Sequence, residues 1–191
     1  MSASSFYSEE ELKELGFASY GKNVLISRYA RFYSPGKMNF GDNVRIDDFA
    51  MLSGRVTLGD HVHIAVSALI FAGDAGVIID KYSTLSSRSA IYAICDELAG
   101  HSILSPTVPA KYSCVSGKSV HVGKHTAICT GCTILPGCNV GEGCTIGAMS
   151  LVNKPLEPWG MYYGIPAKRY AEKSKDLLEL EREYEESIGK R

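Results

Sequence analysis

Aliphatic and aromatic residues recur at every sixth position along most of the chain. One unbroken series consists of Phe40, Ile46, Leu52, Leu58, Ile64 and Ile70, and a second consists of Val122, Ile128, Ile134, Val140, Ile146 and Val152. A three-residue insertion near Gly73–Gly76 separates the first series from Ile79, Leu85 and Ile91. A shorter start at Ile26 and Phe32 is followed by a two-residue insertion at Pro35-Gly36.

A period of six matches neither an amphipathic helix nor a simple alternating strand. Short strands joined by tight corners explain it, because three such strands make one triangular turn of about 18 residues. The hydrophobic residue of each strand then points inward and stacks on its equivalent in the next turn. Gly, Asn or Asp is expected at the corners, where unusual backbone angles are tolerated. The pattern predicts an all-β fold, a parallel β-helix of hexapeptide repeats.

The two ends of the chain follow a helical pattern. Ser8 and Glu11 form a capping box that predicts a short helix, which Gly16 can end. Leucines and Tyr184 alternate with charged residues from Ser174 onward and predict a surface helix with one apolar stripe. We expect that helix to pack on the column or on a neighbouring subunit. The expected organisation is a capping helix at 1–19, a β-helix domain at 20–170 and a C-terminal helix at 171–191.

One stretch, 93–118, breaks the six-residue frame. It contains Cys95-Asp96-Glu97, His101, two prolines and Tyr112. A long excursion from a compact domain is usually functional or disordered. The polar and prolyl residues favour an ordered loop, and we expect the chemistry to lie near it.

Bulk composition narrows the function. The chain has 191 residues and a formal net charge of −1, which gives no sign of a nucleic acid or an anionic membrane as partner. Neither a membrane-spanning apolar run nor a secretory signal is visible, so a cytoplasmic location without membrane insertion is expected. The six cysteines are therefore interpreted as reduced thiols. Cys129 and Cys132 resemble a CxxC motif, but cysteines six apart fall on successive faces, so no metal site is expected.

Two segments resemble the hexapeptide-repeat acyltransferases. They are 140–148, which reads VGEGCTIGA, and 164–168, which reads GIPAK. The chain is similar to the galactoside/maltose O-acetyltransferase and xenobiotic acetyltransferase branch and to bacterial polysaccharide sugar acetyltransferases, over residues 20 to 172. The resemblance implies a left-handed coil, a homotrimer and acetyl-CoA as co-substrate, bound in the groove between neighbouring columns.

In the family that the chain resembles, a histidine just before the excursion acts as general base. Here that position falls at or beside Asp96, and no histidine is present. Three catalytic candidates remain open. Asp96 can act as the base or orient one, which is easier for an amine acceptor; His101 can swing into the site; or His63 can supply the imidazole. Each also has a structural reading, as a loop cap, a solvated loop residue or an outward strand residue.

The resemblance also implies binding residues for the acyl donor. Thr130, Gly131, Ala148 and Ser150 occupy positions that offer backbone groups to the pantetheine arm. Gly164, Pro166, Ala167, Lys168 and Arg169 correspond to the segment beside the adenine end, where the two cations would suit phosphates.

Paired carboxylates beside a cation mark a candidate acceptor site. Arg45, Asp47 and Asp48 could bind sugar hydroxyls or an ammonium group, and Glu97 on the excursion could assist them. The alternative is that the aspartates only stabilise a corner.

Together these features predict an acetyltransferase that moves an acetyl group from acetyl-CoA to a sugar hydroxyl, with an amino-sugar amine as the second choice. The acceptor is expected to be a small sugar or nucleotide sugar, in surface polysaccharide or nucleotide-sugar metabolism. Two other functions are compatible with the pattern. One is a non-catalytic β-helix scaffold that lacks the family histidine. The other is a zinc enzyme of the carbonic-anhydrase type, for which His121 and His125 are spaced four rather than five residues apart.

Overall fold

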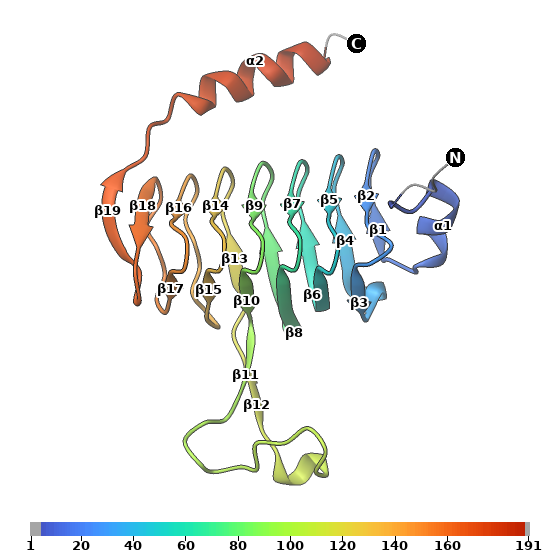
Figure 1. The fold of residues 1–191 in the computed structure, drawn as a ribbon, viewed down its shortest axis with the longest axis vertical. Helices are drawn as coiled ribbons and strands as arrows, with labels where there is room; N and C mark the ends of the chain where they lie inside the picture. Colours follow the sequence, from blue (N-terminus) through green and yellow to red (C-terminus); the bar gives the residue numbers. More distant parts are fainter. Residues whose placement is uncertain (1–4, 190–191) are drawn as a thin grey trace.

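The computed structural model describes residues 5–189 and forms a straight column of stacked triangular turns (Figure 1). Parallel pairing between successive turns builds the column, so the predicted β-helix is confirmed. Each turn contributes one strand to a first face, then one to a second and one to a third. The first face has seven strands among the described residues: β2 (Leu25–Ile26), β5 (Arg45–Ile46), β7 (His63–Ile64), β9 (Thr84–Leu85), β14 (Ala127–Ile128), β16 (Thr145–Ile146) and β18 (Gly160–Tyr163).

The second and third faces join into one nine-stranded sheet because two long strands bend from one face to the other. The second face contains β3 (Arg31–Tyr33), the first parts of β6 (Met51–Leu58) and β8 (Leu69–Ile79), then β10 (Ala90–Tyr92), β15 (Thr133–Ile134) and β17 (Leu151–Val152). The third face contains β1 (Ser19–Tyr20), β4 (Met38–Phe40), the later parts of β6 and β8, and β13 (Val120–Val122), and it continues through single bridges at Val140 and Leu156.

The inward residue of each strand forms the core. Ile46, Leu52 and Ile64 are fully buried, and every residue of the six-residue series is buried except Phe32, which is half-buried. Strand pairing places the equivalent core residues of successive turns side by side, since Ile46 lies beside Ile64 and Ile64 beside Leu85. Each turn thus depends on its neighbours to bury its hydrophobic residues.

Corners are where the structure departs from expectation. We call the corner between the first and second faces the first corner, the next the second corner, and that between the third and first faces the third corner. The left-handed corner positions are not restricted to Gly, Asn and Asp. Several bulky residues also have φ near +60°: Phe49, His61, Tyr82, Arg88, His125, Met149 and Trp159. Such a conformation costs about 1–2 kcal/mol per residue, so neighbouring contacts must offset it.

Stacking between turns decides where a left-handed corner requires glycine. At Gly143 a Cβ atom would lie 2.5 Å from the Trp159 ring of the next turn. Glycine there lets the indole cover the corner. Trp159 therefore packs at the last turn.

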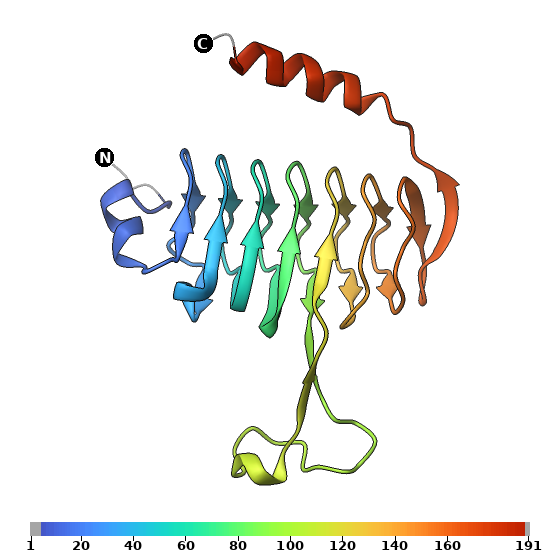
Figure 2. The same ribbon diagram turned by 180° about the vertical axis from the view of Figure 1, so that it is seen from behind.

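All the interruptions of the repeat lie at the second corner. The first is the 3-10 turn η1 (Pro35–Lys37), and the second is the Gly73–Gly76 insertion in β8, which shifts its pairing with β6 between Ser53 and Val56. The third is the excursion itself, in which β11 (Ile94–Asp96) pairs antiparallel with β12 (Val115–Gly117) and the tip carries η2 (Ala110–Tyr112). The hairpin projects from the column at this corner (Figures 1 and 2).

Helix α1 (Glu9–Glu14) covers the N-terminal end of the column. The capping box of Ser8 and Glu11 is present, and Leu12 is 3% exposed within the core. These contacts confirm the predicted short helix.

Helix α2 (Leu177–Gly189) begins six residues later than the expected boundary at 171. Residues before it form β19 (Lys168–Glu172), which pairs antiparallel with β18. The hairpin continues the first sheet, and this edge pairing explains why the helix starts late. From there α2 runs back alongside the column toward its N-terminal end (Figures 1 and 2).

Adjacent isoleucines of β8 provide a test of the stacking. Ile79 is 1% exposed in the core, whereas Ile78 is 46% exposed on the outside. We expect Ile79→Ala to lower the free energy of unfolding in urea by about 2–5 kcal/mol, and Ile78→Ala by about 0.5 kcal/mol or less. Equal losses for the two variants would contradict the core assignment.

Candidate active site

The base of the excursion forms an apolar hollow beside a carboxylate. Phe71 on β8 and Tyr92 on β10 are neighbours on the second face, and their rings stack with centroids 4.9 Å apart and planes 6° apart. The β11–β12 stem adds Ile94, Cys95 and Val115 and places Asp96 at its end. These residues line a hollow of about 290 Å³.

Asp96 is exposed and makes no ion pair within residues 5–189. A carboxylate that the fold does not use for its own stabilisation is available to a ligand. The antiparallel pairing of Asp96 with Val115 fixes its backbone at the mouth of the hollow.

The other excursion candidates lie elsewhere on the loop. The carboxylate of Glu97 accepts hydrogen bonds from the Ala99 and His101 amides, at 2.6 and 2.8 Å, so it closes a loop turn. The side chain of His101 lines a separate hollow of about 460 Å³ with Lys111 and Tyr112 near the tip. No described contact joins His101 to Asp96.

Three candidates predicted from sequence lie together on the first face and first corner. Nε2 of His63 lies 2.7 Å from Oδ2 of Asp47, and Nε of Arg45 donates to Oδ1 of Asp47 at 2.7 Å. Burial alone would raise the pKa of Asp47, but the hydrogen bonds from His63 and Arg45 outweigh it and hold that pKa below its usual range. The charged form of Asp47 therefore orients both side chains.

Asp48 has a structural partner. Its carboxylate accepts a hydrogen bond from the Ser27 hydroxyl of the preceding turn, and its backbone oxygen accepts from the Ser67 amide of the next. Asp48 thereby links three turns of the first corner.

Residues expected to bind the acyl donor lie on the C-terminal turns. The Thr130 hydroxyl donates to the Ser87 carbonyl at 2.6 Å, and Gly131 has a left-handed φ of +70°. Ser150 is buried; its hydroxyl donates to the Gly147 carbonyl at 2.7 Å and accepts from the Gly164 amide at 3.0 Å. The fold thus uses both hydroxyls, while Ala148 stays exposed.

Segment 164–168 forms the turn between β18 and β19 and contains a cis peptide bond at Ile165-Pro166. Ala167 is buried, whereas Lys168 is exposed and makes no ion pair in the described part of the chain. The Arg169 guanidinium pairs with Glu172 at 2.7 Å, which raises its pKa. Lys168 is thus the freer of the two cations for a phosphate.

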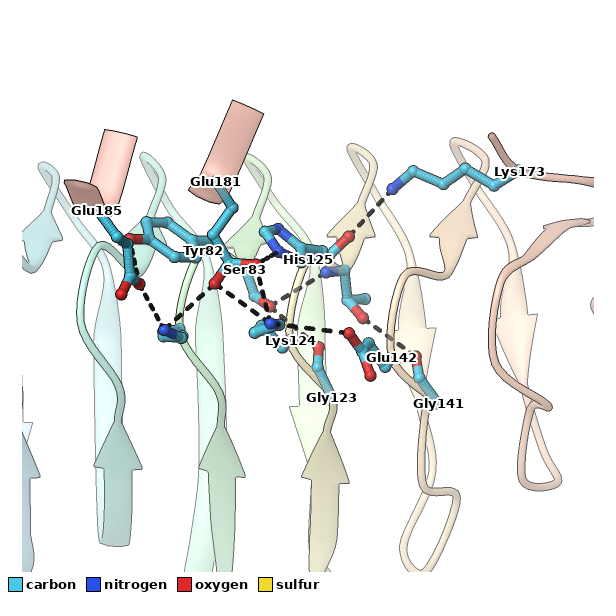
Figure 3. Close-up of polar contacts among 12 residues, drawn as sticks. Tyr82, Ser83, Gly123, Lys124, His125, Gly141, Glu142, Lys173, Glu181 and Glu185 are labelled. Atoms are coloured by element: carbon cyan, nitrogen blue, oxygen red, sulfur yellow. Dashed lines mark hydrogen bonds and ion pairs between the residues drawn. The ribbon is translucent and has the colours of Figure 1, made fainter. Parts of the chain in front are cut away.

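A polar ladder that sequence analysis missed runs along the third corner beneath α2 (Figure 3). The rings of His61, Tyr82 and His125 stack in succession, with centroids 4.9 and 5.3 Å apart. This stacking offsets the cost of their left-handed backbone. His125 is covered, with 9% of its side chain exposed.

Helix α2 binds this ladder through two glutamates. Glu181 accepts from Lys124 at 2.9 Å and lies 2.8 Å from Nε2 of His125, while Glu185 accepts from Lys81 at 2.6 Å (Figure 3). Burial would raise the pKa of Glu181, but hydrogen bonds from His125, Lys124 and Lys81 lower it to about 2. The pKa of Lys81 rises to about 12, chiefly through Glu185.

Metal-binding groups do not converge within the described residues. No cluster of three or more His, Cys, Asp or Glu side chains could hold an ion there. His121 lies 2.8 Å from Oδ2 of Asp80, away from the Glu181–His125 pair. Between residues 5 and 189, no helix is both long and apolar enough to cross a membrane.

Comparison with known proteins identifies the family. The dTDP-4-amino-4,6-dideoxy-D-glucose acyltransferase of Escherichia coli is 40% identical over 179 residues, which cover 92% of this chain and 93% of that relative. The chain belongs to the hexapeptide-repeat acyltransferase family. No protein-family model matches this acyltransferase.

Solved structures of similar proteins agree with this family assignment. AntD, an N-acyltransferase from Bacillus cereus in complex with dTDP and 3-hydroxybutyryl-CoA, is 41% identical and superimposes on this acyltransferase with a TM-score of 0.94, covering 98% of this chain and 100% of that one. An AntD serine variant in complex with dTDP-4-amino-4,6-dideoxyglucose and coenzyme A is 42% identical with a TM-score of 0.92, covering 96% and 98%. A maltose O-acetyltransferase from Clostridium difficile 630, at 19% identity and a TM-score of 0.56 over 87% of this chain and 75% of that one, shares the fold alone.

The α2 contacts of this acyltransferase yield a prediction. Glu181→Gln removes the charge that holds Lys124 and His125, so we expect amide hydrogen exchange in α2 to accelerate about tenfold at neutral pH. Glu183 is exposed and makes no ion pair in the described residues, so Glu183→Gln is the matched control. Unchanged exchange in Glu181→Gln would show that the contacts of Glu181 with Lys124 and His125, here called the Glu181 clamp, do not hold the helix.

The Glu181 clamp should weaken as the pH falls. The pKa of Glu181 is lower in the folded protein than its ordinary value of 4.5. Its contribution to α2 docking is therefore complete above pH 4.5 and is lost as pH falls toward 2. Hydrogen exchange at successive pH values, corrected for the intrinsic rate, measures this loss.

Proposed function

We propose that this protein transfers an acyl group from acyl-CoA to the 4-amino group of dTDP-4-amino-4,6-dideoxyglucose. The Escherichia coli relative is named for that nucleotide sugar, and AntD binds it together with coenzyme A. Identities of 40% and 42% over more than nine-tenths of the chain support the same acceptor and an acyl-CoA donor here. The expectation of a hydroxyl acceptor is not supported, and its amine alternative is favoured.

The proposal depends chiefly on Asp96. A free carboxylate lies beside the apolar hollow at the base of the excursion, where a histidine base was expected. AntD variants with bound ligands alter a serine and an aspartate ten positions apart. In this sequence only Ser86 is followed ten positions later by an aspartate, and that aspartate is Asp96. This spacing supports Asp96 as the base and adds Ser86, which sequence analysis missed, to the site.

A carboxylate suits an amine acceptor for a chemical reason. A neutral amine attacks a thioester without prior loss of a proton, whereas a hydroxyl must lose its proton as it attacks. In the proposed step the amine nitrogen bonds to the thioester carbonyl carbon and becomes positively charged. Asp96 accepts the proton of this acidic nitrogen, the C–S bond breaks, and coenzyme A leaves as a thiolate that is then protonated. An imidazole is not required.

The acyl donor is proposed to lie along the C-terminal turns. Backbone groups at Gly131 and Ala148 would bind the pantetheine arm, and Lys168 would bind a phosphate because no carboxylate holds it. A homotrimer, as the resemblance implies, would close this groove with a neighbouring column. Size-exclusion chromatography with light scattering tests the trimer.

The acceptor is tested with two matched nucleotide sugars. We expect purified enzyme and acetyl-CoA to acylate dTDP-4-amino-4,6-dideoxyglucose, with mass spectrometry of the product as the readout. The counterpart that carries a 4-hydroxyl should react at least 100-fold more slowly, since Asp96 is a weak base for a hydroxyl. Comparable rates for both sugars would refute an amine-specific enzyme, and no turnover of either would favour the scaffold alternative.

Asp96→Asn tests the proposed base. The amide keeps the shape and cannot accept the proton, so we expect kcat to fall about 10²–10⁴-fold while coenzyme A still binds. Asp74→Asn, which changes an exposed carboxylate at the second corner one turn earlier, is the control. His101→Ala should retain activity, because His101 lines a different hollow. Wild-type rates in Asp96→Asn would exclude Asp96 as the base.

A further inference from the structure

The first corner carries a row of exposed side chains that the proposed chemistry does not use. Tyr29 and Phe49 are 57% and 62% exposed, and Arg88 is exposed two turns beyond Phe49. Backbone hydrogen bonds from Ser67 to Asp48 and from Arg88 to Val66 connect these turns in register. The row therefore lies in a line parallel to the column axis.

Tyr29 and Phe49 form an aromatic pair with one side open to solvent. Their ring centroids are 5.8 Å apart and their planes differ by 39°. Phe49 has a left-handed φ of +60°, which costs energy and turns a large apolar ring outward. The hydrophobic effect opposes that arrangement. A planar base stacked on the rings would cover this surface, as aromatic platforms do for single nucleotides.

One cationic side chain follows the aromatic pair along the same line, and two further basic side chains lie beside it. Arg88 makes no ion pair within residues 5–189, so its guanidinium is free to bind an anion. Arg45 and His63 lie on the first face beside this corner, and both contact the single carboxylate of Asp47. The two guanidinium groups of Arg88 and Arg45 exceed the one carboxylate of Asp47 by one positive charge. Guanidinium groups bind phosphate oxygens in a bidentate manner.

The spacing of the turns matches an extended nucleotide sugar. Neighbouring strands lie about 4.8 Å apart. Phe49 and Arg88, two turns apart, are thus separated by about 10 Å along the axis, and Tyr29 and Ser86, three turns apart, by about 14 Å. Those spans suit a pyrimidine nucleoside diphosphate followed by a hexose.

We infer that the first corner binds the nucleotide half of the acceptor, an assignment that rests on the proposed function. The pyrimidine stacks on Phe49 and Tyr29, Arg88 and His63 bind the diphosphate, and the sugar continues toward Ser86. His63 is accordingly a binding residue here and not the catalytic base.

Calorimetric binding of dTDP, without acyl donor, tests the aromatic platform. Phe49→Leu and Tyr29→Leu keep the corner and remove the ring, and we expect each to weaken dTDP binding about tenfold. Tyr33 is also 57% exposed but lies on the second face, so Tyr33→Leu is the matched control with wild-type affinity expected. Circular dichroism and thermal unfolding establish that each variant is folded.

Arg88→Gln tests the phosphate contact. It should weaken dTDP binding about tenfold and leave the weaker binding of thymidine unchanged, because thymidine has no phosphate. Arg55→Gln, at an exposed arginine of the second corner, is the control. With the full nucleotide sugar, Phe49→Leu and Arg88→Gln should raise KM and preserve kcat, since neither side chain contacts the reacting atoms.

The outcomes separate this inference from the proposed function. Suppose that the wild type acylates the amino sugar, and that the folded Phe49→Leu and Arg88→Gln variants bind dTDP with wild-type affinity. The proposed function then stands, but the first corner is not the nucleotide site. If Phe49→Leu changes the oligomeric state by light scattering, the aromatic pair is a subunit contact and the inference is wrong. Failure of the wild type to acylate any dTDP-amino sugar would reject the function itself.

Discussion

Each turn of this protein has too little hydrophobic surface to form a core alone, so every inward side chain must stack on its equivalent in the next turn. Fully buried residues such as Ile46, Ile64 and Leu85 lie directly beside one another through parallel pairing. A single residue inserted within a strand would turn its hydrophobic side chain outward. Extra residues can therefore enter only at corners. Among the described residues they enter at the second corner, from the short turn at Pro35–Lys37 to the excursion that follows Ala93.

This constraint determines where chemistry can occur. The column is rigid and periodic, and an excursion can place side chains beyond the surface of the triangle. Asp96 lies at the end of the excursion stem, next to the stacked rings of Phe71 and Tyr92 that belong to the column. The projecting hairpin and the wall of the column thus meet at one carboxylate. The absence of a histidine there fits an acceptor whose nitrogen attacks before it loses its proton.

Sequence periodicity predicted the column well because the buried positions obey one simple rule, as the unbroken series from Val122 to Val152 illustrates. Corner side chains follow no such rule. Phe49, Tyr82 and His125 adopt left-handed backbone, which is rare for bulky residues, and only contacts between turns explain it. Long-range pairs were equally hidden, since Glu181 reaches His125 across 56 positions of sequence. His63 and Asp47 were both named as candidates, but their 2.7 Å contact depends on the pairing of successive turns.

The boundary of α2 was missed for a related reason. Residues 168–172 read KRYAE and show no strand-like alternation of polar and apolar side chains. Only the presence of an open sheet edge at β18 makes them a strand. An edge is a property of the assembled sheet, which the local sequence does not encode.

A crystal structure with coenzyme A and dTDP-4-amino-4,6-dideoxyglucose would test the central claim most directly. The account predicts the amino nitrogen about 3 Å from a carboxylate oxygen of Asp96, with the pyrimidine ring against Phe49 and the diphosphate at Arg88. A sugar whose amine lies beside His63 or His101, with Asp96 pointing into solvent, would contradict it.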